Sequence, residues 1–115
     1  MTYRTLDPSE LPKLIRDNIP EITMESEGKT IICHTLNDED FLEYLFQKIT
    51  EEVKECHESK HNEEELKKEL ADLYEVIDTI LALKNFDKNK ILEIQAQKKL
   101  KNGGFKKRLL MTGKR

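Results

Sequence analysis

The chain contains few of the residues on which β-sheet and disulfide-rich domains depend. It has no tryptophan, two cysteines, three prolines and four glycines, and aromatic residues make up 6% of its 115 positions. Cys33 and Cys56 are too few for a disulfide framework, and no CxxC pair indicates a structural zinc site. No apolar run approaches the roughly 20 residues of a membrane span, and residues 1–10 have no signal-peptide core. We therefore expect a soluble, cytoplasmic protein without a membrane partner.

Charged residues dominate the composition instead. Charged and apolar residues each account for 37% of the chain, a balance typical of amphipathic helices rather than of a β-sandwich. The net charge of −3 conceals an asymmetry, because acids dominate residues 38–78 whereas bases cluster in residues 84–115. The sequence predicts one all-α domain over residues 1–115. Its expected parts are an N-terminal arm with a short helix (1–36), a helical core (37–101) and a basic tail (102–115).

An apolar stripe at helical spacing predicts the first long helix. Its members are Phe41, Leu42, Leu45, Phe46, Ile49, Val53 and Cys56. Asn37 and Asp40 precede the stripe with the spacing of a capping box, with Asp in place of the usual Glu. We therefore expect a helix over residues 38–58.

A second stripe begins after a polar break at residues 59–62. Asn62 and Glu65 repeat the capping signal before it, which predicts a helix over residues 63–84. Because the connection is short, the two long helices are expected to be antiparallel neighbours. Asp87 is a suitable N-cap for a third helix over residues 88–100.

The N-terminal part gives weaker signals. Residues 7–10 resemble a turn that leads into a short helix bearing Leu11, Leu14, Ile15 and Ile19. Pro20 is expected to end or bend this helix. Residues 29–34 are rich in β-branched side chains, but a lone strand would have no partner, so coil is predicted there.

Two acidic pairs lie at the borders of the long stripes. Glu52 with Glu55, and Glu69 with Asp72, are spaced i and i+3, which places each pair on one helix face. In an antiparallel pair joined near Lys60, all four acids lie at similar distances from the connecting turn, so they are level with one another along the helix axes. Any one of them alone is most often a solvated acid, but four converging carboxylates would repel one another. Hard divalent cations prefer oxygen ligands and remove that repulsion, so the pattern predicts a metal site.

The same segment resembles a known family. Glu51-Glu52-Val53-Lys54-Glu55, thirteen further residues and Glu69-Leu70-Ala71-Asp72 reproduce the EExxE…ExxD signature of the all-α nucleoside triphosphate pyrophosphohydrolases. That group includes MazG and phosphoribosyl-ATP pyrophosphohydrolase. Lys48 stands where the family's KxxEE lysine stands. Residues 13–20 and 101–105 resemble the ends of a phosphoribosyl-ATP pyrophosphohydrolase-like subgroup, from whose pattern Asn18 and Asn102 depart.

The resemblance implies hydrolysis of a nucleoside triphosphate or related nucleotide between its α and β phosphates, which gives a monophosphate and pyrophosphate. The implied ligands of one or more Mg²⁺ ions, with Mn²⁺ as a substitute, are Glu52, Glu55, Glu69 and Asp72. Either Glu51 or Glu52 would orient or deprotonate the attacking water. The implied phosphate contacts are Lys48, Arg16, Lys98 and Lys101. The long apolar stripes and the family together indicate a homodimer or a dimer of dimers that completes a four-helix core.

The same sequence allows three other interpretations. A non-catalytic helical interaction module would keep the bundle and use its tail or its acidic face for a partner. A zinc site could be drawn from Cys56, His57 and His61 together with Cys33 and His34. It is disfavoured because the polar break separates His57 from His61 and no ligand pair has the spacing of a zinc finger. Nucleic acid is an unexpected partner, since the basic tail has no interleaved aromatic residue besides Phe105.

Overall fold

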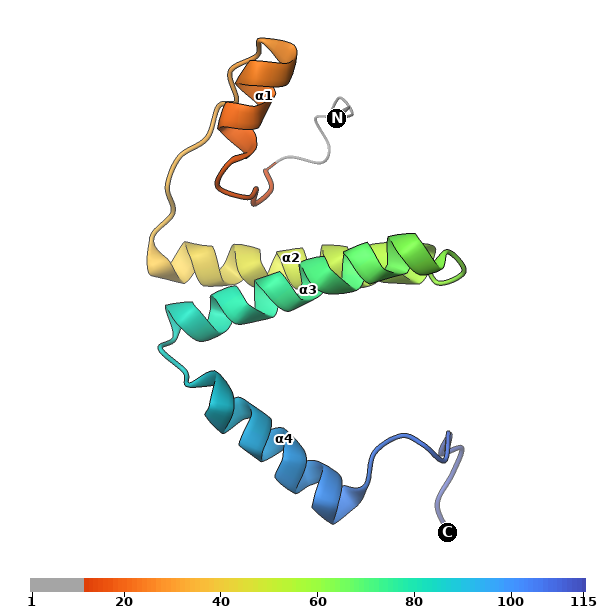
Figure 1. The fold of residues 1–115 in the computed structure, drawn as a ribbon. Helices are drawn as coiled ribbons and strands as arrows, with labels where there is room; N and C mark the ends of the chain where they lie inside the picture. Colours follow the sequence, from red (N-terminus) through yellow and green to blue (C-terminus); the bar gives the residue numbers. More distant parts are fainter. Residues whose placement is uncertain (1–11) are drawn as a thin grey trace.

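The computed structural model describes residues 12–115, and all the regular structure in that range is helical. The helices are α1 (Ile19–Glu27), α2 (Asp38–Glu58), α3 (Glu63–Leu83) and α4 (Lys88–Asn102). Helices α2 and α3 pack side by side as an antiparallel hairpin, with α1 on one side of it and α4 on the other (Figure 1). The all-α class and the antiparallel pair are thus confirmed. None of these helices combines the length and the apolar character that crossing a membrane requires.

Local side-chain signals determine where the three later helices begin. The side-chain oxygens of Asn37 and Asn62 accept the backbone N–H three residues further on, at 2.8 and 3.2 Å. The Asp87 carboxylate accepts the N–H two residues further on at 2.9 Å. These bonds satisfy donors that the first helical turn leaves free, and each is worth about 1 kcal/mol. The predicted starts of α2, α3 and α4 are therefore confirmed.

The N-terminal helix lies elsewhere than predicted. The sequence pattern placed it before Pro20, but α1 begins at Ile19 and carries Pro20 in its first turn. Proline is well tolerated there, because the N–H that it lacks has no helical partner in a first turn. Gly28, with φ of 67°, ends α1 by donating its N–H to the Met24 carbonyl. The predicted turn at residues 7–10 lies outside the described residues.

The rest of the N-terminal segment is irregular. Leu14 and Ile15 precede α1 without belonging to it, whereas Leu11 lies outside the described residues. Residues 29–34 connect α1 to α2 without regular structure, as the coil prediction required.

The hairpin has a small apolar core. Among residues 12–115, Leu45 on α2 and Val76 on α3 are the buried apolar side chains, at 2% and 7% exposed. Phe46 and Val53 belong to the predicted stripe of α2 but remain about half exposed. The radius of gyration is 18.2 Å, whereas a compact domain of this length has one of about 13 Å. Helices α1 and α4 thus leave much of the hairpin uncovered.

Candidate metal centre

Three acidic side chains meet in the middle of the hairpin. Glu52 comes from α2 and Glu69 and Asp72 from α3, and one carboxylate oxygen of each lies within 4.8 Å of the others. They meet because residues at similar distances from the turn of an antiparallel hairpin lie opposite one another. Opposite oxygen ligands of one Mg²⁺ ion are about 4 Å apart. The cluster thus has nearly the dimensions of a divalent cation's oxygen shell.

Glu52 is buried in an unusual way for a charged residue. It is 4% exposed, and no other ionisable side chain in the described part of the chain is buried. The Oε2 atoms of Glu52 and Glu69 are both buried and have no hydrogen-bond partner in the protein. Burying a carboxylate without a partner costs several kcal/mol unless a cation compensates. The donor set, which consists of carboxylate oxygens alone, fits a hard divalent cation.

Burial and crowding make these carboxyl groups hard to ionise. Burial raises the pKa of Glu69 to about 8, and the neighbouring carboxyl groups of Glu55 and then Glu52 add to the effect. Burial also raises the pKa of Glu52, with repulsion from Glu55 as the next cause and Lys48 opposing it. Glu55 thus lies beside the cluster, but it does not belong to the group of three acids whose oxygens lie within 4.8 Å of one another. Of the four predicted metal ligands, the structure brings three together and places the fourth at their border.

Basic side chains surround the acids on one side. Lys48 lies one turn before Glu52 on α2, and its Nζ is 3.8 Å from Glu52 Oε1 and 3.5 Å from Glu51 Oε2. Lys13, which sequence reasoning did not select, places its Nζ 3.9 Å from Glu51 Oε1. The only signal for Lys13 is its place in the flanking segment 13–20. Glu51, a candidate base, is therefore held between two lysines.

Two other predicted basic residues have different positions. Arg16 donates from Nη2 to Asp72 Oδ1 at 2.6 Å, so it contacts a predicted metal ligand directly. Lys98 and Lys101 lie exposed on α4, which runs away from the hairpin (Figure 1). Within one chain, the structure does not bring these two lysines to the acidic cluster.

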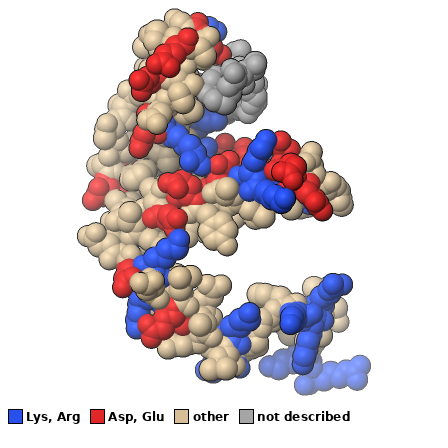
Figure 2. All heavy atoms as spheres, in the orientation of Figure 1, with Lys and Arg blue, Asp and Glu red and all other residues tan. Residues whose placement is uncertain are grey.

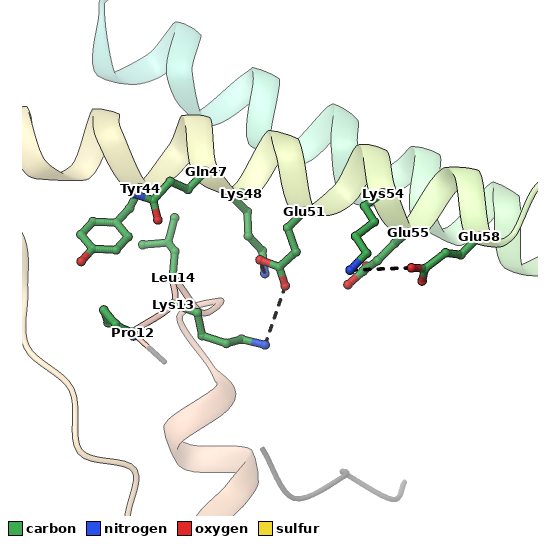
Figure 3. Close-up of a pocket in the computed structure, with 10 residues that line it drawn as sticks. All are labelled: Pro12, Lys13, Leu14, Tyr44, Gln47, Lys48, Glu51, Lys54, Glu55 and Glu58. Carbon is green, nitrogen blue, oxygen red and sulfur yellow. Dashed lines mark ion pairs between the residues drawn. The ribbon is translucent and has the colours of Figure 1, made fainter. Parts of the chain in front are cut away.

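A cavity of about 440 Å³ lies along α2. Lys48, which is 3.8 Å from Glu52, lines it, whereas the three clustered acids do not. Its walls come from the segment before α1 and from α2, as Figure 3 shows. One end has the apolar and amide groups of Pro12, Leu14, Tyr44 and Gln47. The remainder is lined by the charged side chains of Lys13, Lys48, Glu51, Lys54, Glu55 and Glu58. Its volume falls within the range of small-molecule sites.

The alternative zinc site has no geometric support among the described residues. The acidic trio is the one metal-sized group found there, and it contains neither histidine nor cysteine. The exposed ring of His57 has Lys60 Nζ 3.4 Å from its Nε2. Burial and the charge of Glu69 raise the pKa of the Cys56 thiol, which disfavours the thiolate that zinc binds.

Comparisons with known proteins do not identify the chain. No protein-family model, curated protein or solved structure matches it. The resemblance to the pyrophosphohydrolases therefore rests on the motif residues between Lys48 and Asp72 and on the flanking segments. It remains a prediction, and no family is assigned.

Proposed function

We propose that this protein hydrolyses a nucleoside triphosphate, or a related nucleotide, between the α and β phosphates with the help of Mg²⁺. The single observation that carries the proposal is the buried Glu52 carboxylate, which has an unpartnered oxygen and faces Glu69 and Asp72. An acid in that position is costly in a purely structural role. The cost is offset if the three carboxylates bind a cation that also binds phosphate.

The metal ligands in this proposal are Glu52, Glu69 and Asp72, with Glu55 available at their border. A bound Mg²⁺ supplies neutralisation of the phosphate chain and a lower pKa for a coordinated water. Glu51 is the better candidate to orient or deprotonate the water, because its carboxylate lines the cavity whereas Glu52 is turned into the hairpin. Lys48 and Lys13 hold the Glu51 carboxylate in place at 3.5 and 3.9 Å.

The cavity has two ends that suit the two parts of a nucleotide. Its charged part carries the ammonium groups of Lys13, Lys48 and Lys54, which can attract a polyphosphate. Each of these lysines now pairs with a glutamate on the cavity wall or beside it, at 3.5 to 4.0 Å. The other end offers the Tyr44 ring for stacking on a base and the Gln47 amide for hydrogen bonding to its edge (Figure 3).

Product analysis across a panel of standard and modified triphosphates tests this proposal directly. We expect pyrophosphate and a nucleoside monophosphate to form with Mg²⁺ or Mn²⁺ and not to form in the presence of a chelator. Glu52→Gln or Asp72→Asn should abolish turnover while helicity stays intact. Glu75→Gln, which changes an exposed acid on the same helix as Asp72, serves as the control and should keep full activity.

The second candidate function is a non-catalytic interaction module. It is favoured by the exposed apolar side chains on α4 and in the tail, among them Leu100, Phe105, Leu109, Leu110 and Met111. Absence of turnover for every triphosphate, together with no thermal shift on addition of Mg²⁺, would support this function and reject the enzymatic one.

A further inference from the structure

Helix α4 and the segment after it make no extensive contact with any other helix described in residues 12–115. We call residues 88–115 the basic arm, and every one of them is exposed. Four large apolar side chains project from α4 and four from the tail: Ile91, Leu92, Ile94, Leu100, Phe105, Leu109, Leu110 and Met111. A helix of 15 residues is marginal in water without tertiary packing. The basic arm is therefore expected to bind a partner surface.

The amount of exposed surface indicates how large that partner surface is. The chain exposes 10630 Å², whereas a folded monomer of 13.6 kDa exposes roughly 6,600 Å². The excess of about 4,000 Å² per chain is well above the roughly 800 Å² that each partner buries in an interface of standard size. A small peptide or a rim contact would not cover it.

Charge identifies the kind of partner. The basic arm contains ten Lys and Arg against one acid, whereas the hairpin of residues 38–83 contains fifteen Asp and Glu against five Lys. Figure 2 shows the same separation, with acids spread over α1 and the hairpin and bases gathered on the C-terminal tail. The hairpin of the same protein is thus a long acidic surface whose charge complements that of the basic arm.

In this structure the basic arm is directed away from its own hairpin (Figure 1). Lys88 Nζ lies 3.0 Å from Asp78 Oδ1, which ties the first turn of α4 to the end of α3. From there α4 runs away from the hairpin (Figure 1), and its 15 residues form a rod of about 22 Å. We therefore consider the hairpin of a second copy as the surface that such an arm contacts.

One face of α4 combines apolar and basic groups. Ile91, Ile94, Lys98 and Lys101 are spaced at i, i+3, i+7 and i+10, which places them on one side of the helix. Ile91 and Ile94 are the least exposed of the four large apolar residues on α4. Lys99 lies off this face. The isoleucines can pack on the half-exposed Phe46 and Val53 of another α2, while the lysines extend the contact towards acids.

We propose that the basic arm of one copy packs on the hairpin of a second copy, so that its Lys98 and Lys101 lie beside the second copy's acidic cluster and cavity. By this assignment the cavity of a single copy lacks free positive charge for phosphate, because its own lysines already pair with glutamates. The docking itself is independent of the proposed function. The use of Lys98 and Lys101 as phosphate contacts rests on it.

Cross-linking between labelled and unlabelled copies tests the docking. Equal amounts of ¹⁴N and ¹⁵N protein are mixed, and a carbodiimide joins amines to carboxylates that lie in contact. We expect mixed-isotope peptides that join Lys98 or Lys101 to acids within residues 51–72, in a species that light scattering identifies as a dimer or larger. A monomer at all concentrations, or links confined to one isotope, would overturn the proposal. So would release of the arm's partner by nuclease, because it would identify nucleic acid as the occupant.

Complementation separates the docking from the chemistry. A Lys98→Glu/Lys101→Glu variant has an altered arm, and Asp72→Asn has an altered acidic cluster. If the arm acts across copies, a refolded equal mixture should regain about one quarter of wild-type activity, since half of the dimers are mixed and each has one intact site. Lys99→Glu, one residue away on another face, is the control and should retain activity alone. If the mixture gains no activity although the cross-links between copies still form, the arm docks on the second copy but has no role in turnover. No turnover by wild type would reject the proposed function instead, with the cross-linking result unaffected.

Discussion

Arg16 and Asp72 form the shortest ion pair among the described residues, with 2.6 Å between Nη2 and Oδ1. The pair joins the segment before α1 to α3 across 56 positions of sequence. Its consequence for the site is twofold. Arg16 holds that segment over the hairpin, where Pro12, Lys13 and Leu14 form one wall of the cavity. It also places a guanidinium group beside Asp72, which under the proposed function is a ligand of the metal that binds phosphate.

Replacing Arg16 by alanine should separate these roles. Because the side chains of Arg16 and Asp72 are 59% and 41% exposed, loss of the pair should change the free energy of unfolding by less than about 1 kcal/mol. Asp72 loses a competing cation, so Mg²⁺ affinity should stay equal or rise. The KM for the nucleotide should increase about tenfold, as loss of about 1.4 kcal/mol of binding requires. Calorimetry with Mg²⁺ and steady-state kinetics measure the two effects. Weaker Mg²⁺ binding in the variant would show that Arg16 supports the metal site instead.

Replacing Glu52 by glutamine should have opposite effects on stability and activity. Glutamine has nearly the same shape but no charge, so the metal-free variant should be at least as stable as wild type in urea unfolding. Stabilisation by Mg²⁺ should disappear, and turnover should fall by about a hundredfold or more. Glu75→Gln again provides the matched control. A metal-free Glu52→Gln variant that unfolds more readily would indicate that the acid has a structural role.

The raised pKa of Glu69 predicts a pH dependence with a definite sign. The folded protein holds this proton up to a pKa of about 8, whereas the unfolded chain releases it near the ordinary value of 4.5. The folded state thus binds more protons between these values, and the contribution of Glu69 to stability decreases as pH rises through that window. Thermal unfolding of wild type and Glu69→Gln in a chelator, from about pH 5 to pH 8.5, isolates the effect.

The free energy of unfolding of wild type should decrease relative to that of Glu69→Gln as pH rises. Saturating Mg²⁺ should reduce this slope, because metal ligation needs the ionised carboxylate at every pH. For the same reason, Mg²⁺ binding should release protons below pH 8. A difference that does not change with pH would mean that Glu69 ionises normally.

The end of the cavity near Tyr44 predicts a role in selecting the nucleotide. Tyr44→Ala removes the ring that can stack on a base, an interaction worth about 1–3 kcal/mol in other proteins that bind bases. We expect KM to rise by one to two orders of magnitude with kcat nearly unchanged, since the ring lies away from the acids. Tyr44→Phe should behave like wild type. A fall in kcat alone would indicate that Tyr44 acts on the reacting phosphates instead.

Local signals made much of the fold predictable. The capping residues Asn37, Asn62 and Asp87 act within three positions of sequence, so the helix starts could be predicted from nearby residues alone. The meeting of Glu52 with Glu69 and Asp72 was also predictable, because a short turn determines which residues of an antiparallel hairpin face each other.

Features that depend on distant parts of the chain could not be predicted in this way. Pro20 is compatible with the end of one helix or the first turn of another, and the sequence pattern favoured the wrong one. The contacts of Lys13 with Glu51 and of Arg16 with Asp72 depend on how the segment before α1 crosses the hairpin. The spacing of apolar residues within one helix does not indicate how a distant segment of the chain packs across it.

The last prediction concerns the core that holds the site together. Leu45 is 2% exposed and is the most buried apolar side chain of the described residues. Leu45→Ala should lower the free energy of unfolding by about 2–5 kcal/mol, because it removes packed methyl groups and leaves a cavity between α2 and α3. Ile32→Ala, in the irregular segment before α2, is 98% exposed and should change it by less than about 0.5 kcal/mol. Urea unfolding followed by circular dichroism measures both. Since the acids from α2 and α3 meet only while these helices stay packed, Mg²⁺ should raise the free energy of unfolding of both wild type and Leu45→Ala; no rise in either protein would mean that the ion does not bind across the two helices.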